Sequence, residues 1–165
     1  STRDVWTLCG CYLHLLAILG KLDPKAVEEV VGYFRTIKFQ NDFEVMDKEK
    51  VGMNIPLILL PVMYSIATGA YEEDFGRSME ALDKYRQRYL ENDKNRRSAI
   101  FLKLLLALAK RNFEGIQAER KIEKEWALLQ KEPPQLAGQS FAVEFVPYED
   151  LWEMLATWKP ATSKI

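Results

Sequence analysis

The sequence is poor in the residues that carry most catalytic and metal chemistry. Its 165 residues include one histidine, two cysteines and eight glycines. No acidic residue lies three or four positions from His14, so a histidine-based metal site or proton relay is not expected. The glycines are scattered singly, without a phosphate-binding loop, and no Gly-x-Ser-x-Gly motif surrounds a serine. These absences predict a protein that is not an enzyme and that binds no metal or cofactor.

Net charge and long apolar runs are also lacking. With 23 basic and 24 acidic residues, the net charge of −1 provides no long-range attraction to nucleic acid or to an anionic membrane. The longest apolar runs, residues 55–67 and 99–109, are shorter than the roughly 20 residues that a membrane-spanning helix requires. Cys9 and Cys11 point to different faces of a helix and cannot bridge each other, which suits a reducing compartment. We therefore expect a cytoplasmic protein without a membrane partner.

Helical periodicity dominates what is present. Asp23 and Pro24 have the pattern of an N-cap followed by proline at the first helical position. Three amphipathic helices are predicted from apolar residues spaced three and four apart. Their stripes are Val27, Val30, Val31, Phe34 and Ile37; Tyr71, Phe75, Met79, Leu82, Tyr85 and Tyr89; and Phe113, Ile116, Ile122, Trp126 and Leu129.

Three further segments, residues 5–19, 55–67 and 99–109, are apolar nearly all the way round and predict helices that are covered on more than one side. They alternate with the amphipathic helices. The links are residues 20–23, 68–70 and 110–112, and such short links favour antiparallel hairpins. Pro56 is expected in a first helical turn, Pro61 is expected to bend its helix, and Asp93 is a candidate cap. Gly20 and Gly69 fit left-handed residues that end a helix.

The all-α class is therefore predicted, as a single helical-repeat domain over residues 1–165. Its antiparallel hairpins cover about residues 4–38, 54–91 and 94–131, followed by a tail over residues 132–165. Tyr71 and Phe113 occupy similar turns 42 residues apart, and Gly20 and Gly69 lie 49 residues apart, which is typical of helical-hairpin repeats.

Gly69-Ala70-Tyr71, with Ala81 ten residues later, resembles the turn and second helix of a tetratricopeptide repeat. In that family a small residue, an aromatic residue and a later small residue let two helices pack closely. The matching sequence motif is confined to one hairpin. The expected arrangement of helices resembles that of the family over about residues 4–131. It implies a solenoid-like array of a divergent helical-repeat family, whose members hold other proteins or peptides.

The tail departs from this pattern. Pro133 and Pro134 end the last amphipathic helix, and residues 141–146 alternate as an extended strap does. Pro147 opens a final helix that is expected to cap the last hairpin. Its apolar face is Tyr148, Leu151, Trp152, Leu155 and Trp158.

The first apolar helix has no predicted neighbour on its outer side. Exposing three of its leucines would forgo about 5–9 kcal/mol of burial. The sequence therefore predicts either a fragment that lacks upstream repeats or a homodimer, in which the added surface covers residues 5–19.

The leading functional hypothesis is a scaffold or adaptor that binds a protein or peptide. The alternative is a nucleic-acid-binding regulatory module that uses the basic cluster of residues 84–97, and a third class is an enzyme domain whose active site lies on a part outside this sequence. The candidate partner-binding residues are Lys84, Tyr85, Arg86, Arg88, Tyr89, Arg96, Arg97, Trp152 and Trp158.

Overall fold

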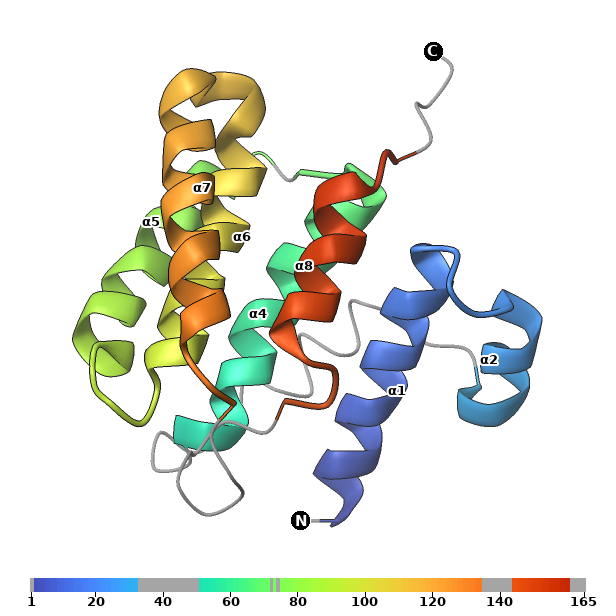
Figure 1. Cartoon of the computed structure of the whole chain (residues 1–165). Coiled ribbons are helices and arrows are strands. Elements are labelled where there is room, and N and C mark those ends of the chain that lie inside the picture. The colour runs from blue at the N-terminus through green and yellow to red at the C-terminus, as the bar shows by residue number, and fades with distance from the viewer. Residues whose placement is uncertain (1, 33–50, 72, 74, 135–143, 161–165) are drawn as a thin grey trace.

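The computed structural model describes residues 2–32, 51–71, 73, 75–134 and 144–160, and every regular element among them is helical (Figure 1). The all-α prediction is thus confirmed. In chain order the elements are α1 (Thr2–Ile18), α2 (Pro24–Val31), α4 (Val51–Thr68), α5 (Phe75–Tyr85), the π-helical segment η1 (Arg86–Leu90), α6 (Arg96–Glu114), α7 (Ile116–Lys131) and α8 (Tyr148–Thr157).

Helices α4 and α6 form the centre of the core. Each was predicted to be covered on several sides, and each contacts several neighbours: α4 packs against α1, α6 and α8, while α6 packs against α4, α7 and η1. Their largest fully buried side chains are Ile55, Leu59, Leu60, Met63, Phe101, Leu102, Leu104 and Leu105. Nearly uniform hydrophobicity around a helix therefore identified the two most enclosed elements correctly.

Helices α1 and α2 follow each other after a short link and pack against each other. Gly20 has a φ of 72°, and the Asp23 carboxylate accepts a hydrogen bond from the Lys25 amide at 3.1 Å to cap α2. Of the predicted stripe, Val27 is buried but Val30 is 79% exposed. Val31 of the stripe is also exposed, and Phe34 and Ile37 lie outside the described residues.

Part of the surface of α1 is covered within this chain. Leu8 and Leu15 are fully buried, since α2 and α4 both pack against α1, while Leu13 and Leu16 are half-buried. The Tyr64 hydroxyl of α4 also donates a hydrogen bond to the Cys11 carbonyl at 2.6 Å, and the Tyr12 ring contacts Phe145. The burial argument for a homodimer or for missing upstream repeats therefore does not apply to Leu8 and Leu15, and the homodimer or upstream neighbour stays a prediction.

Helix α4 begins earlier than predicted. Because it starts at Val51, Pro56 lies inside the helix and not in its first turn, and Pro61 lies one further turn on. Each proline removes one backbone hydrogen bond. Burial on several sides offsets these losses, so the helix continues to Thr68 and ends at Gly69 with a φ of 69°.

Helix α5 does not pack extensively along α4, so the closely packed hairpin expected for residues 54–91 is not seen among the described residues. It continues instead into η1, which packs against α6. The buried face contains Met79, Arg86 and Leu90, and not the expected Tyr89, which is exposed. Ala81, whose counterpart in tetratricopeptide repeats permits a close approach, is exposed.

The most extensively packed hairpin is α6–α7, but its turn lies later than predicted. Helix α6 continues through residues 110–112 to Glu114, and the turn is at Gly115, with a φ of 53°. The N-cap of α6 is Asn95, not the expected Asp93. At the other end of the chain, residues 141–143 of the strap predicted over residues 141–146 lie outside the described residues.

The final helix, α8, follows Pro147 as predicted, but it does not cap the end of an array. Figure 1 shows it lying across α4, between α1 and the α6–α7 hairpin. Its Trp152 packs against Trp126 of α7, and the Trp158 indole donates to the Ala67 carbonyl at 2.7 Å. This bond satisfies one of the terminal carbonyls of α4, so α8 is a central part of the core.

Replacing Gly69 by alanine should lower the free energy of unfolding by about 1–2 kcal/mol, because a left-handed φ is costly for residues with a Cβ. A Cβ at this position would also lie 3.1 Å from Cγ of Pro160. Gly76→Ala is the matched control, since Gly76 lies inside α5 with open space around it and should gain about 0.5–1 kcal/mol. Urea unfolding of both variants measures the difference; equal effects would contradict this description of the turn.

Candidate functional site

The basic cluster of residues 84–97 was the main site predicted from the sequence, and the structure divides it. Arg86 in η1 is buried, although it was expected on the surface. Its guanidinium lies 2.9 Å from the Asp83 carboxylate and also pairs with Glu91. Arg86 lies two helical turns after buried Met79 and one turn before buried Leu90, so its ion pairs connect to the buried side of η1.

Arg97 is the most completely enclosed cation of the cluster, with an exposed fraction of 5%. It donates to both carboxylate oxygens of Glu144, at 2.7 and 3.1 Å, and to Glu149 at 2.8 Å. A further bond of 2.6 Å reaches the Glu132 carbonyl beyond the end of α7. Burial alone would lower the pKa of Arg97, but the hydrogen bonds to Glu144 and Glu149 outweigh it and raise the pKa.

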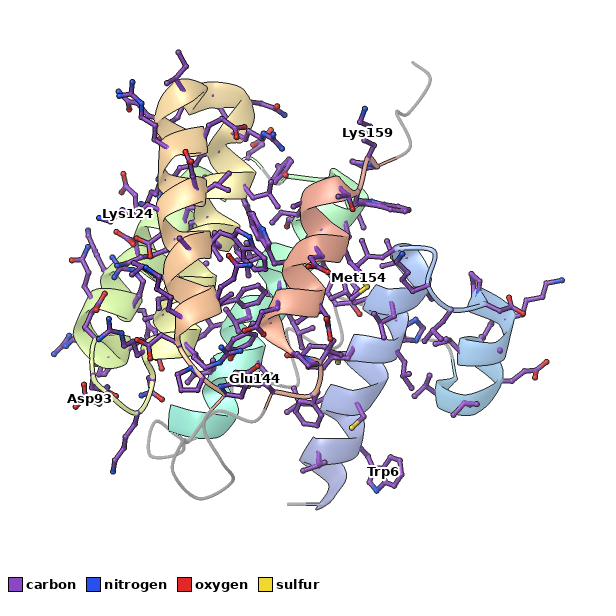
Figure 2. The ribbon with its side chains drawn as sticks, viewed as in Figure 1. Trp6, Asp93, Lys124, Glu144, Met154 and Lys159 are labelled. Atoms are coloured by element: carbon purple, nitrogen blue, oxygen red, sulfur yellow. The ribbon has the colours of Figure 1, made fainter. Side chains whose placement is uncertain are left out.

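Tyr148 connects this ion pair to the aromatic core. Its ring stacks on Phe101 with centroids 4.4 Å apart, and its hydroxyl lies 2.8 Å from the Ser98 hydroxyl. The Tyr148 amide donates to Glu144 at 3.2 Å, so the carboxylate that binds Arg97 also satisfies the N-terminus of α8. Figure 2 shows Glu144 in this position below α8. Arg97 and its partners thus fasten α8 to α6 and α7.

The remaining residues of the predicted cluster lie closer to the surface. Lys84 and Arg88 are exposed, Arg88 lies over the Tyr89 ring, and the Tyr85 and Tyr89 rings are 4.8 Å apart. Arg96 pairs with Glu132 at 2.7 Å. The continuous basic surface that the nucleic-acid alternative requires is therefore reduced to a few scattered cations.

The two tryptophans proposed as contacts for a partner both take part in internal packing. Trp152 is buried, and half-buried Trp158 uses its indole N–H in the bond to α4. Their prediction as exposed contacts is wrong for Trp152, because α8 turns its aromatic face inward. Trp6, which was not proposed, points away from the neighbouring helices (Figure 2).

Sequence analysis missed the exposed apolar pair at the turn of the α6–α7 hairpin. Phe113 and Ile116 are 85% and 71% exposed, although both were assigned to a buried stripe. Gly115 between them was the available signal, since glycine commonly ends a helix in a left-handed conformation. A turn at Gly115 places both side chains at the tip of the hairpin, beyond the end of the core.

Cys11 is the most enclosed of the nucleophilic groups considered from the sequence. Its thiol donates to the Thr7 carbonyl at 3.0 Å, and burial raises the pKa of Cys11 to about 12. Neither it nor Cys9 forms a disulfide. In the parts of the chain that the structure describes, no group of three or more His, Cys, Asp or Glu side chains is arranged to hold a metal ion.

Replacing Arg97 by methionine should lower the free energy of unfolding at pH 7 by about 3 kcal/mol, because it leaves two carboxylates without their counter-charge. The hydrogen bond from Arg97 holds the pKa of Glu149 below its ordinary value. This contribution is therefore complete above the ordinary glutamate pKa of about 4.3 and is lost as the pH falls through the lowered value. The difference between the wild type and Arg97→Met should shrink over that acidic range.

Arg96→Met is the matched control, since Arg96 is about half exposed and forms a single ion pair at the surface. It should cost no more than about 1 kcal/mol. Chemical denaturation of the three proteins between about pH 3 and pH 7 provides the comparison. A similar small effect of both substitutions would contradict the role assigned to Arg97.

No protein-family model, no curated protein and no solved structure matches this chain. Among the residues with described positions, no helix is both long enough and apolar enough to cross a lipid bilayer.

Proposed function

We propose that this chain is a protein-binding module, without catalytic activity of its own, and that the tip of the α6–α7 hairpin contacts the partner. The observation that carries the proposal is the exposure of Phe113 and Ile116 on either side of Gly115. Single exposed apolar residues are common, but two large ones on one short turn form a concentrated apolar surface. Burying each against a partner would contribute about 1.5–3 kcal/mol.

The surroundings of this pair support the proposal. Lys110 and Glu114 pair across one helical turn at 3.9 Å, and Arg111 pairs with Glu119 across the hairpin. Charged residues therefore flank an apolar centre, which is the usual composition of a protein interface. The hairpin is also the most closely packed in the chain. A rigid support lowers the entropy lost on binding.

The partner expected for this surface is a protein or peptide with an apolar pocket or groove. A reducing compartment such as the cytoplasm suits the proposal, because Cys9 and Cys11 are both free thiols. The nucleic-acid alternative has less support, since Arg86 and Arg97 are enclosed by carboxylates.

The double substitution of Phe113 and Ile116 by serine tests the proposal. It should leave the melting temperature nearly unchanged, because neither side chain belongs to the core. It should also weaken complexes captured by cross-linking in native cells at least about tenfold. Val30→Ser is the matched control, since Val30 is a similarly exposed apolar residue on α2. Quantitative mass spectrometry of the captured proteins measures the loss.

Complexes that persist in the double variant, or that weaken equally in Val30→Ser, would overturn the assignment of this surface. Elution from heparin distinguishes the alternative function. Retention that decreases steeply with salt, and that depends on Lys84 and Arg88, would favour nucleic acid instead.

A further inference from the structure

A pocket of about 350 Å³ lies at the opposite end of the α6–α7 hairpin from the Phe113 tip. It is enclosed by the link between η1 and α6, by the first turns of α6 and by the last turns of α7. Figure 2 shows Asp93 on that link. The volume is near the lower limit of pockets that bind small molecules, so a small ligand is expected.

Glu125 of α7 lines this pocket and is only 4% exposed. No donor among the described residues reaches its Oε2 atom. Its Oε1 atom lies 3.9 Å from Lys103 Nζ, which is longer than a hydrogen bond. An enclosed carboxylate oxygen without a donor costs about 1–3 kcal/mol, and a ligand that supplies the donor would recover this free energy.

Lys103 of α6 provides a positive charge beside that carboxylate. Its Nζ atom lies between Glu125 and Glu91, 3.7 Å from Glu91 Oε1, so it is close to both carboxylates without a normal hydrogen bond to either. Glu91 already pairs with Arg86. The ammonium of Lys103 is thus available to donate to a negatively charged group in the pocket.

Charges of both signs therefore line the same small volume, and Asp93 and Arg96 also belong to its lining. Lys103 would repel a simple cation that approached Glu125, and Glu125 would repel a simple anion that approached Lys103. A ligand that carries both charges a few ångströms apart avoids both penalties. The apolar residues of the lining are Ala99, Ile100 and Leu128. They favour a ligand that also carries an apolar group.

We propose that this pocket binds a small zwitterion, specifically an α-amino acid with an aliphatic side chain. Its ammonium group donates to Glu125 Oε2, its carboxylate accepts from Lys103 Nζ, and its side chain packs against Ile100 and Leu128. The site is independent of the proposed protein-binding tip, which lies about 15 Å further along α6.

Isothermal titration calorimetry with L-leucine tests this assignment on the intact chain. Two analogues separate the charges: 3-methylbutylamine lacks the carboxylate, and 4-methylpentanoate lacks the ammonium. Leucine should bind the wild-type protein at least about tenfold more tightly than either analogue. This comparison needs no mutant and therefore does not depend on how a variant folds.

The variants Glu125→Gln and Lys103→Met should each weaken leucine binding at least about tenfold. The matched control variants are Glu123→Gln and Lys124→Met, which change exposed residues of α7 just before Glu125. Both control variants should bind leucine as the wild type does. Lys124 is labelled in Figure 2. Amide chemical-shift changes on adding leucine should centre on Lys103 and Glu125.

Three results would overturn the proposal. The first is the absence of binding by leucine, isoleucine and valine at about 10 mM, where even a millimolar site would be well occupied. The second is equal binding of the amine alone, which would indicate a site for cations. The third is binding that both pocket variants retain, which would place the ligand elsewhere.

Discussion

The guanidinium of Arg97 joins the start of α6 to the end of α7 and to the segment that begins α8. Its partners Glu144 and Glu149 lie 47 and 52 residues away in the sequence. A buried cation is unfavourable without its counter-charges, so a position of α8 that brings both carboxylates to Arg97 is stabilised. In that position α8 packs against α4. The Trp158 bond to Ala67 then holds its other end, and the central core is closed.

This arrangement determines which residues remain available to a partner. Two of the cations that looked suited to binding, Arg86 and Arg97, and both tryptophans are used in packing inside the molecule. The α6–α7 hairpin supports two features with different chemistry. Its tip presents apolar side chains, and its base contains a pocket with charges of both signs. The protein and the small ligand that we propose as partners would therefore bind at separate places on this hairpin.

Local sequence patterns predicted the helices well, but they predicted the tertiary arrangement poorly. Apolar runs located α4 and α6, Asp23 and Pro24 marked the start of α2, and glycines marked two turns. These features depend on a few neighbouring residues. The burial of Arg86 depends on its ion pairs with Asp83 and Glu91, and the burial of Arg97 depends on carboxylates beyond residue 140. Helical periodicity does not reveal these ion pairs, so the candidate site included cations that the fold encloses.

Hydrogen exchange of the α8 amides tests most directly whether the Arg97 network makes this helix part of the core. If it does, the amides of Leu151 and Leu155 should exchange as slowly as those of Leu104 and Leu105 in α6, because all four open only on global unfolding. Exchange in α8 that is orders of magnitude faster than in α6, in the native protein at neutral pH, would show that α8 opens separately and would contradict the account.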